Sequence, residues 1–112
     1  MNLPREFKQA YLNLYEGGFR QPQAFLAYVY QLLSRRFRPG IEGYSALRIC
    51  EIFRKSVKQD FGPLTSTVLK NWEVKEYAQL GQAIFALAEQ GCLRLQENDR
   101  MDDFEKAGNI VL

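Results

Sequence analysis

The chain has 112 residues, of which 46% are hydrophobic, 13% aromatic and 25% charged, and its formal net charge is +2. This composition is typical of a globular domain with its own core, and it argues against a disordered or membrane-embedded chain. Histidine is absent, which excludes Ser-His-Asp and Cys-His catalysis and the HExxH metal site.

Three amphipathic helices are predicted in the first 60 residues. The first begins after Pro4 and ends at Gly17-Gly18. The second begins at Pro22 and ends in the arginine cluster of residues 35–38, before Pro39-Gly40. The third spans about 46 to 60, with Ser45 as its N-cap and Gly62 as its stop. Residues at helical spacing form their apolar stripes: Phe7, Ala10, Tyr11 and Leu14, then Phe25, Val29, Leu32 and Leu33, then Ile49, Cys50, Phe53 and Val57.

Two further helices and a small β-element are predicted in the second half. Pro63 starts a short helix that carries Leu64, Val68, Leu69 and Trp72, and a longer helix with Tyr77, Leu80, Ile84, Leu87 and Ala88 ends at Gly91. The alternation in residues 92–95 predicts a short strand, and residues 109–112 are its expected partner. Between them lies an acidic loop or helix, residues 97–105, which Phe104 anchors in the core.

No repeat or linker divides the chain, so we expect a single domain over residues 1–112. No apolar run reaches the ~20 residues that span a bilayer, and the N-terminus lacks the apolar core of a signal peptide, so a cytoplasmic location is expected. Cys50 and Cys92 lie in apolar stretches without metal-site spacing, which favours buried, reduced thiols. No cofactor and no metal are predicted.

The charges are unevenly distributed along the chain. Residues 1–58 carry +6 and residues 59–112 carry −4. Such a chain can bind an acidic partner through its first half, pair head to tail with a second copy, or neutralise itself on folding, and the last is favoured. The strongest local features are a basic set, Arg35, Arg36 and Arg38, and an acidic set, Asp99, Asp102 and Asp103. The acidic segment does not have the ligand spacing of an EF-hand loop.

The helix order in the second half is also that of a winged helix-turn-helix, with residues 75–90 in the recognition position. This segment offers Lys75, Gln79 and Gln82 to nucleic acid. Its polar face is close to neutral because Glu76 and Glu89 stand against Lys75, so a core helix is favoured over a recognition helix.

Residues from about 19 to 104 resemble a small family of uncharacterised bacterial proteins, mainly planctomycete and verrucomicrobial. The matching residues include Ala24-Phe25, Phe61-Gly62-Pro63-Leu64, Thr67-Val68-Leu69, Trp72, Leu80-Gly81-Gln82-Ala83-Ile84-Phe85, Leu87, Glu89, Gly91, Leu93, Asp99 and Asp103-Phe104. The chain departs from the family at Tyr44-Ser45, in place of a histidine-containing turn, and at Glu73, in place of glycine. The resemblance implies no activity, substrate or cofactor.

The sequence therefore predicts a mainly α domain of about five helices with a small C-terminal β-element, arranged as an irregular bundle or as a winged helix. The expected function is a non-enzymatic protein-binding module that uses the basic and acidic sets, with a homodimer as one form of the interaction. The alternative is a winged-helix nucleic-acid binder that uses the arginines with Lys75, Gln79 and Gln82. An enzyme that works through carboxylates or a lysine is the third class considered.

Overall fold

The protein is mainly helical, as predicted, and a computed structural model describes residues 5–19, 22–36, 45–89 and 101–112. All five predicted helices are present, and the acidic segment contributes one more. In chain order the elements are α1 (Arg5–Glu16), α2 (Gln23–Arg36), α3 (Ala46–Phe61), the 3-10 helix η1 (Gly62–Leu64), α4 (Thr65–Asn71), α5 (Tyr77–Glu89) and α6 (Met101–Lys106).

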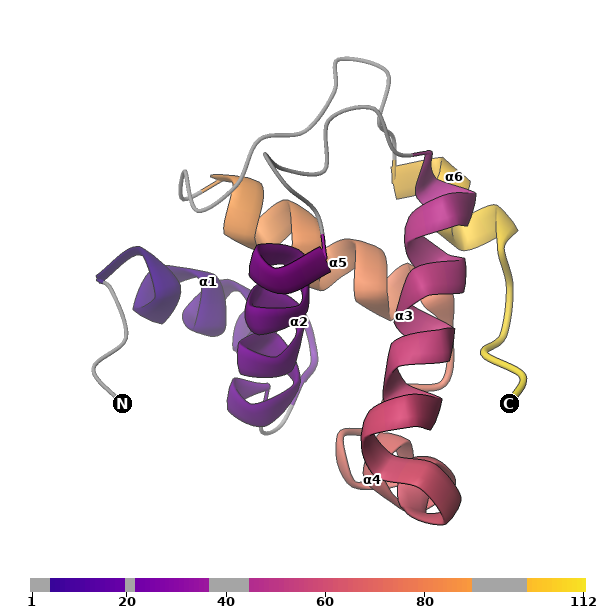
Figure 1. Ribbon diagram of the computed structural model, residues 1–112. Coiled ribbons are helices and arrows are strands. Elements are labelled where there is room, and N and C mark those ends of the chain that lie inside the picture. Colours follow the sequence, from indigo (N-terminus) through magenta and orange to yellow (C-terminus); the bar gives the residue numbers. More distant parts are fainter. Residues whose placement is uncertain (1–4, 20–21, 37–44, 90–100) are drawn as a thin grey trace.

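Helix α5 lies across the middle of the molecule, and α1, α2 and α6 all pack against it (Figure 1). Helix α3 stands at an angle to α5 and contacts η1, α4 and α6. The segment after α6 runs along the outside of the molecule beside α3 (Figure 1). The arrangement is an irregular bundle in which one helix, α5, is surrounded by several others.

Several helix ends follow the predicted chemistry. Ser45 has an extended backbone, and its hydroxyl accepts a hydrogen bond from the Arg48 backbone N–H, which is the predicted N-cap of α3. Gly62 ends α3 with φ 53° and ψ −128°, a positive φ that glycine adopts without steric cost. Gly18, with φ 109°, ends α1, and the next residue, Phe19, donates its N–H to the Leu14 carbonyl.

Helix α4 ends in the same kind of turn, but a glutamate occupies the left-handed position. Glu73 has φ 59°, and its N–H donates to the Lys70 carbonyl while the Val74 N–H donates to the Leu69 carbonyl. These two bonds define a Schellman motif, and the buried side chains of Leu69 and Val74 make the apolar contact that accompanies it. Glycine is the usual residue at this position because L side chains are strained there.

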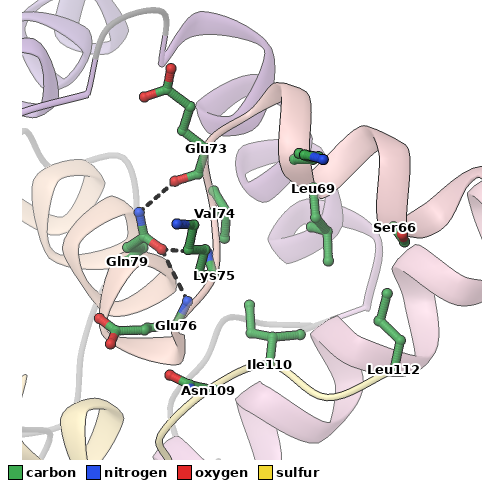
Figure 2. Close-up of a pocket in the computed structure, with 11 residues that line it drawn as sticks. Ser66, Leu69, Glu73, Val74, Lys75, Glu76, Gln79, Asn109, Ile110 and Leu112 are labelled. Carbon is green, nitrogen blue, oxygen red and sulfur yellow. Dashed lines mark hydrogen bonds between the residues drawn. The ribbon is translucent and has the colours of Figure 1, made fainter.

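The start of α5 is capped from within the helix. The Gln79 side-chain oxygen accepts hydrogen bonds from the backbone N–H groups of Lys75 and Glu76, and the Gln79 amide donates to the Glu73 carbonyl at 2.7 Å (Figure 2). A side chain at the third helical position that bonds back to the N-cap residue is half of a capping box. Gln79 therefore fixes the path of the chain between α4 and α5.

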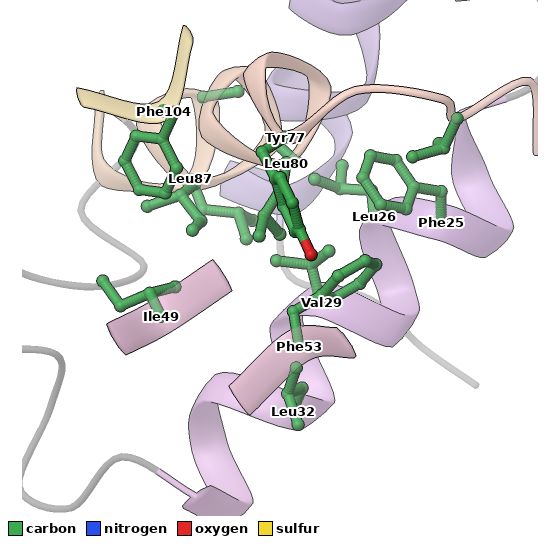
Figure 3. Close-up of a cluster of buried hydrophobic side chains, with 14 of the residues drawn as sticks. Phe25, Leu26, Val29, Leu32, Ile49, Phe53, Tyr77, Leu80, Leu87 and Phe104 are labelled. Atoms are coloured by element: carbon green, nitrogen blue, oxygen red, sulfur yellow. The ribbon is translucent and has the colours of Figure 1, made fainter. Parts of the chain in front are cut away.

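The core joins buried side chains from all the α-helices of the described residues. Figure 3 shows those that α2, α3, α5 and α6 contribute. Helices α2 and α3 meet largely through aromatic rings: Phe25 lies edge-on to Phe53 at 6.3 Å, and Tyr28 contacts Phe53 and Phe61. Trp72 packs against both Phe25 and Tyr28. Edge-to-face ring pairs add to the free energy of burial, so this cluster holds α2 against the α3–α4 corner.

Phe104 is the predicted anchor of the acidic segment, and it is 1% exposed. It rests on Gly81 of α5 so closely that a Cβ built on that glycine would lie 2.8 Å from the Phe104 Cβ and Cγ atoms. On its other side Phe85 meets the Phe104 ring edge-on at 6.3 Å. Helix α6 can approach α5 to this distance only because residue 81 has no side chain.

Two sequence expectations need correction. Leu64 is expected on the short helix that Pro63 starts, but it is the last residue of the 3-10 helix η1 and is 63% exposed, because the regular helix begins only at Thr65. The β-element is not confirmed. Residues 92–95 lie outside the described part of the chain, and residues 109–112 make only one isolated antiparallel bridge there, between Asn109 and Glu76.

Gly81→Ala is expected to destabilise the protein by about 1–3 kcal/mol, because the added methyl group overlaps Phe104. Helix propensity alone predicts the opposite sign, a gain of about 1 kcal/mol. Urea unfolding followed by Trp72 fluorescence measures the difference, with Gln82→Ala on the exposed side of α5 as the matched control. A Gly81→Ala variant as stable as the wild type would contradict the close contact.

Glu73→Gly is expected to raise the free energy of unfolding by about 0.5–1 kcal/mol, because glycine adopts the left-handed conformation without strain. Glu73→Val is expected to lower it, since a β-branched residue is the least tolerant of positive φ. The same urea titration measures both variants. A loss of stability in Glu73→Gly would show that the glutamate side chain contributes more than its backbone strain costs.

Candidate binding groove

An open groove of about 1000 Å³ lies between α4 and residues 108–112, which we call the C-terminal segment (Figure 2). Residues 73–76, which connect α4 to α5, form its third side. Gln79 of α5 lines the groove together with residues of these three parts: Ser66, Leu69 and Lys70, then Glu73, Val74, Lys75 and Glu76, then Asn109, Ile110 and Leu112.

The floor of the groove is apolar. Leu69 and Val74 are buried because the turn after α4 presses them together, and Ile110 and Leu112 reach toward them from the C-terminal segment (Figure 2). Leu112 remains 42% exposed. Apolar side chains that stay partly in contact with water favour an occupant that covers them.

The rim of the groove is charged and nearly neutral. Lys70 and Lys75 lie on it together with Glu73 and Glu76, and none of the four makes an ion pair with a residue in the described part of the chain. All four are exposed. An apolar centre with a solvated polar rim is the usual organisation of a protein interface.

Backbone hydrogen bonds hold the C-terminal side of the groove in place. The Tyr77 N–H donates to the Gly108 carbonyl at 3.0 Å, and the Ile110 N–H donates to the Lys75 carbonyl at 2.8 Å. Gly108 turns the chain out of α6 with φ 75°. The position of the groove wall therefore depends on α6 and on the start of α5.

A smaller hollow of about 410 Å³ lies on another side of the same connecting segment. It shares Glu73, Lys75, Glu76 and Gln79 with the groove, and its other lining residues are residues 17–19 and Gln82. The segment from 73 to 79 is thus accessible from two sides.

The predicted basic set is only partly described. Arg35 lies at the end of α2, where its guanidinium is 3.5 Å from the Asp60 carboxylate of α3. The Tyr28 hydroxyl donates to the same carboxylate at 2.7 Å. Of Arg36 only the backbone is described, and Arg38 lies outside the described residues. Arg35 is therefore partly neutralised within the molecule, across the boundary between the basic and acidic halves.

Two members of the predicted acidic set, Asp102 and Asp103, lie in the first turn of α6. Asp102 is exposed and Asp103 half-buried, and neither makes an ion pair within the described ranges. Carboxylates at this place are stabilised by the positive end of the helix dipole. Asp99 lies outside the described residues.

Of the three residues in segment 75–90 predicted to contact nucleic acid in the alternative function, only two are available for such a contact. Lys75 and Gln82 are exposed, but both ends of the Gln79 amide are occupied by backbone groups. Most of α5 is buried: Tyr77, Leu80, Gly81, Ala83, Ile84, Ala86 and Leu87. A helix surrounded in this way presents little surface to a DNA groove.

The titratable groups in the described residues do not form a catalytic set. Burial raises the pKa of the Cys50 thiol to about 12 and also raises the pKa of Tyr77, so neither group is activated as a nucleophile or base. A hydrogen bond from Lys55, followed by one from Arg48, lowers the pKa of the exposed Glu51. Among these residues no cluster of three Cys, Asp or Glu side chains could hold a metal ion.

The predicted state of Cys50 is confirmed, since it is a buried, free thiol, whereas Cys92 lies outside the described residues. The groove was not predicted. The sequence predicts residues 109–112 as a strand that pairs with residues 92–95, but it does not identify residues 75–77, beside which the segment lies, because they show no alternation typical of a strand.

No protein-family model matches the chain, and the searches found neither a curated protein nor a solved structure similar to it. Of the helices in the described residues, none has the length and apolar character needed to cross a membrane.

Proposed function

We propose that this protein is a non-enzymatic protein-binding module and that the groove between α4 and the C-terminal segment receives a segment of its partner. The observation that carries the proposal is the groove's organisation: an apolar floor, a rim of both charge signs and a wall of extended backbone. Deep, enclosed cavities suit small ligands, whereas an open groove of this kind suits a polypeptide.

The acidic turn of α6 is a second contact in this proposal. Asp102 and Asp103 precede the C-terminal segment by only a few residues and keep their charges unpaired within the described part of the molecule. A partner with basic residues beside its apolar segment would meet both features. Charges of this kind mainly raise the association rate and the selectivity of an interface.

The nucleic-acid alternative has less support, because Gln79 is engaged in capping and α5 is mostly buried. Arg35, the described member of the arginine set, already faces Asp60. An enzymatic function has no support from the groove, whose lining residues include no cysteine and no histidine.

Selection from a displayed library of random 12-residue peptides tests the proposal. We expect peptides that bind the wild type and lose at least about tenfold in affinity, or about 1.4 kcal/mol, with Leu112→Asp, which charges the groove floor. Fluorescence anisotropy of the labelled peptides measures the affinities. The double variant Asp102→Lys, Asp103→Lys is expected to slow association, and Lys8→Glu on α1 is the control.

Circular dichroism must show that each variant keeps the helical content of the wild type. The proposal fails if no peptide is enriched over an unrelated helical protein, or if the enriched peptides bind Leu112→Asp as tightly as the wild type. Salt-sensitive binding of a mixed-sequence DNA duplex, lost on Arg35→Glu, would favour the nucleic-acid alternative instead.

A further inference from the structure

To the other described residues, the C-terminal segment, residues 108–112, is hydrogen bonded along one edge only. The bonds from Tyr77 to Gly108 and from Ile110 to Lys75 flank the bridge between Glu76 and Asn109. In this antiparallel pattern the bridged residues are the non-hydrogen-bonded pair, so the N–H and C=O of Asn109 point away from residue 76.

Val111 presents its backbone to the same open side. Asn109, Ile110 and Leu112 line the groove, whereas Val111 does not and is 74% exposed, so residues 110–112 alternate as an extended chain does. Backbone groups two residues apart in an extended chain share one edge. Asn109 and Val111 therefore offer two donors and two acceptors in strand register.

These groups have no partner in the described part of the molecule. No hydrogen bond joins the backbone of Asn109 or Val111 to another described residue. Asn109 is exposed as well, so the edge is accessible to solvent. An edge with open N–H and C=O groups is a template for another extended chain.

We propose that a second copy of the chain docks on this edge, with residues 109–111 of the two copies paired antiparallel about a twofold axis at Ile110. In this register Asn109 lies opposite the partner's Val111, and Val111 opposite the partner's Asn109. Both pairs are of the hydrogen-bonded type, so they use the donors and acceptors that point outward. A single surface that complements itself is the requirement for a twofold dimer.

Apolar side chains favour the same pairing. Ile110 would face the partner's Ile110 on the groove side, where cross-strand β-branched pairs are stabilising. Val111, which is 74% exposed, would be covered on the other side. Because the edge is short, the contact is smaller than the ~1,200 Å² of a stable interface, so the dimer should form only at high concentration.

Sedimentation velocity over increasing protein concentration, up to about 1 mM, tests the proposal. We expect the wild type to pass from monomer to dimer and Val111→Pro to remain monomeric. Proline removes the Val111 N–H, which bonds no residue in the described part of the chain, so the helices should be unaffected. Thermal unfolding verifies this. A second pair of variants controls for the loss of an exposed apolar side chain: Val111→Lys is expected to weaken the dimer, and Leu12→Lys on α1 is expected to leave it unchanged. Lysine replaces proline in this pair because proline would break α1.

Amide hydrogen exchange at low and high concentration locates the contact. Protection of Asn109 and Val111 should increase with concentration, by about tenfold or more once dimer predominates. Concentration-independent protection of these amides would mean that the predicted strand 92–95 of the same chain occupies the edge, which would overturn the proposal.

A wild type that stays monomeric at every concentration, or a dimer that persists in Val111→Pro, would also overturn it. This inference does not depend on the proposed function, because the open edge of residues 109–111 points away from residues 75–77, of which Lys75 and Glu76 line the groove. The two tests are also separate, since the peptide selection uses immobilised protein at a density too low for dimers to form.

Discussion

The contact between Phe104 and Gly81 determines where the last part of the chain lies. Without a side chain at residue 81, α6 comes close enough to α5 for the Phe104 ring to be fully buried. The turn at Gly108 then brings residues 108–112 beside residues 75–77, where two backbone hydrogen bonds hold them. Both the groove and the open edge exist because of this sequence of contacts, so a structural glycine on the buried helix shapes the surface that we assign to binding.

The opposite wall of the groove has a different origin. A Schellman turn after α4 places Glu73 in a left-handed conformation, and Gln79 then holds the next residues in an extended path through three hydrogen bonds. The two walls meet at the bridge between Glu76 and Asn109. The strained glutamate thus lies beside the groove, and because strained backbone clusters at functional sites, its position agrees with the proposed role of the groove.

Helix positions could be predicted because their signals are local. Ser45, Gly62 and the apolar stripes of α2 and α3 identify their helices within a few residues of sequence. The groove could not be predicted, because it depends on contacts between residues 75–77 and 108–110 and on the missing Cβ of Gly81. The partner of Arg35 was also missed, since Asp60 lies 25 positions away in the chain and its sequence surroundings do not identify it. Local chemistry determined the helices, and long-range packing determined the candidate site.

Amide hydrogen exchange in the wild type and in Phe104→Leu tests most directly whether the Phe104 contact positions the groove wall. The account predicts that the amides of Tyr77 and Ile110 lose protection together in this variant, while the amide of Phe53 in α3 keeps more of its protection, because the smaller side chain loosens α6 and the segment that follows it. Protection of Ile110 that is unchanged while α6 is loosened would contradict the account, because the C-terminal segment would then be held independently of Phe104.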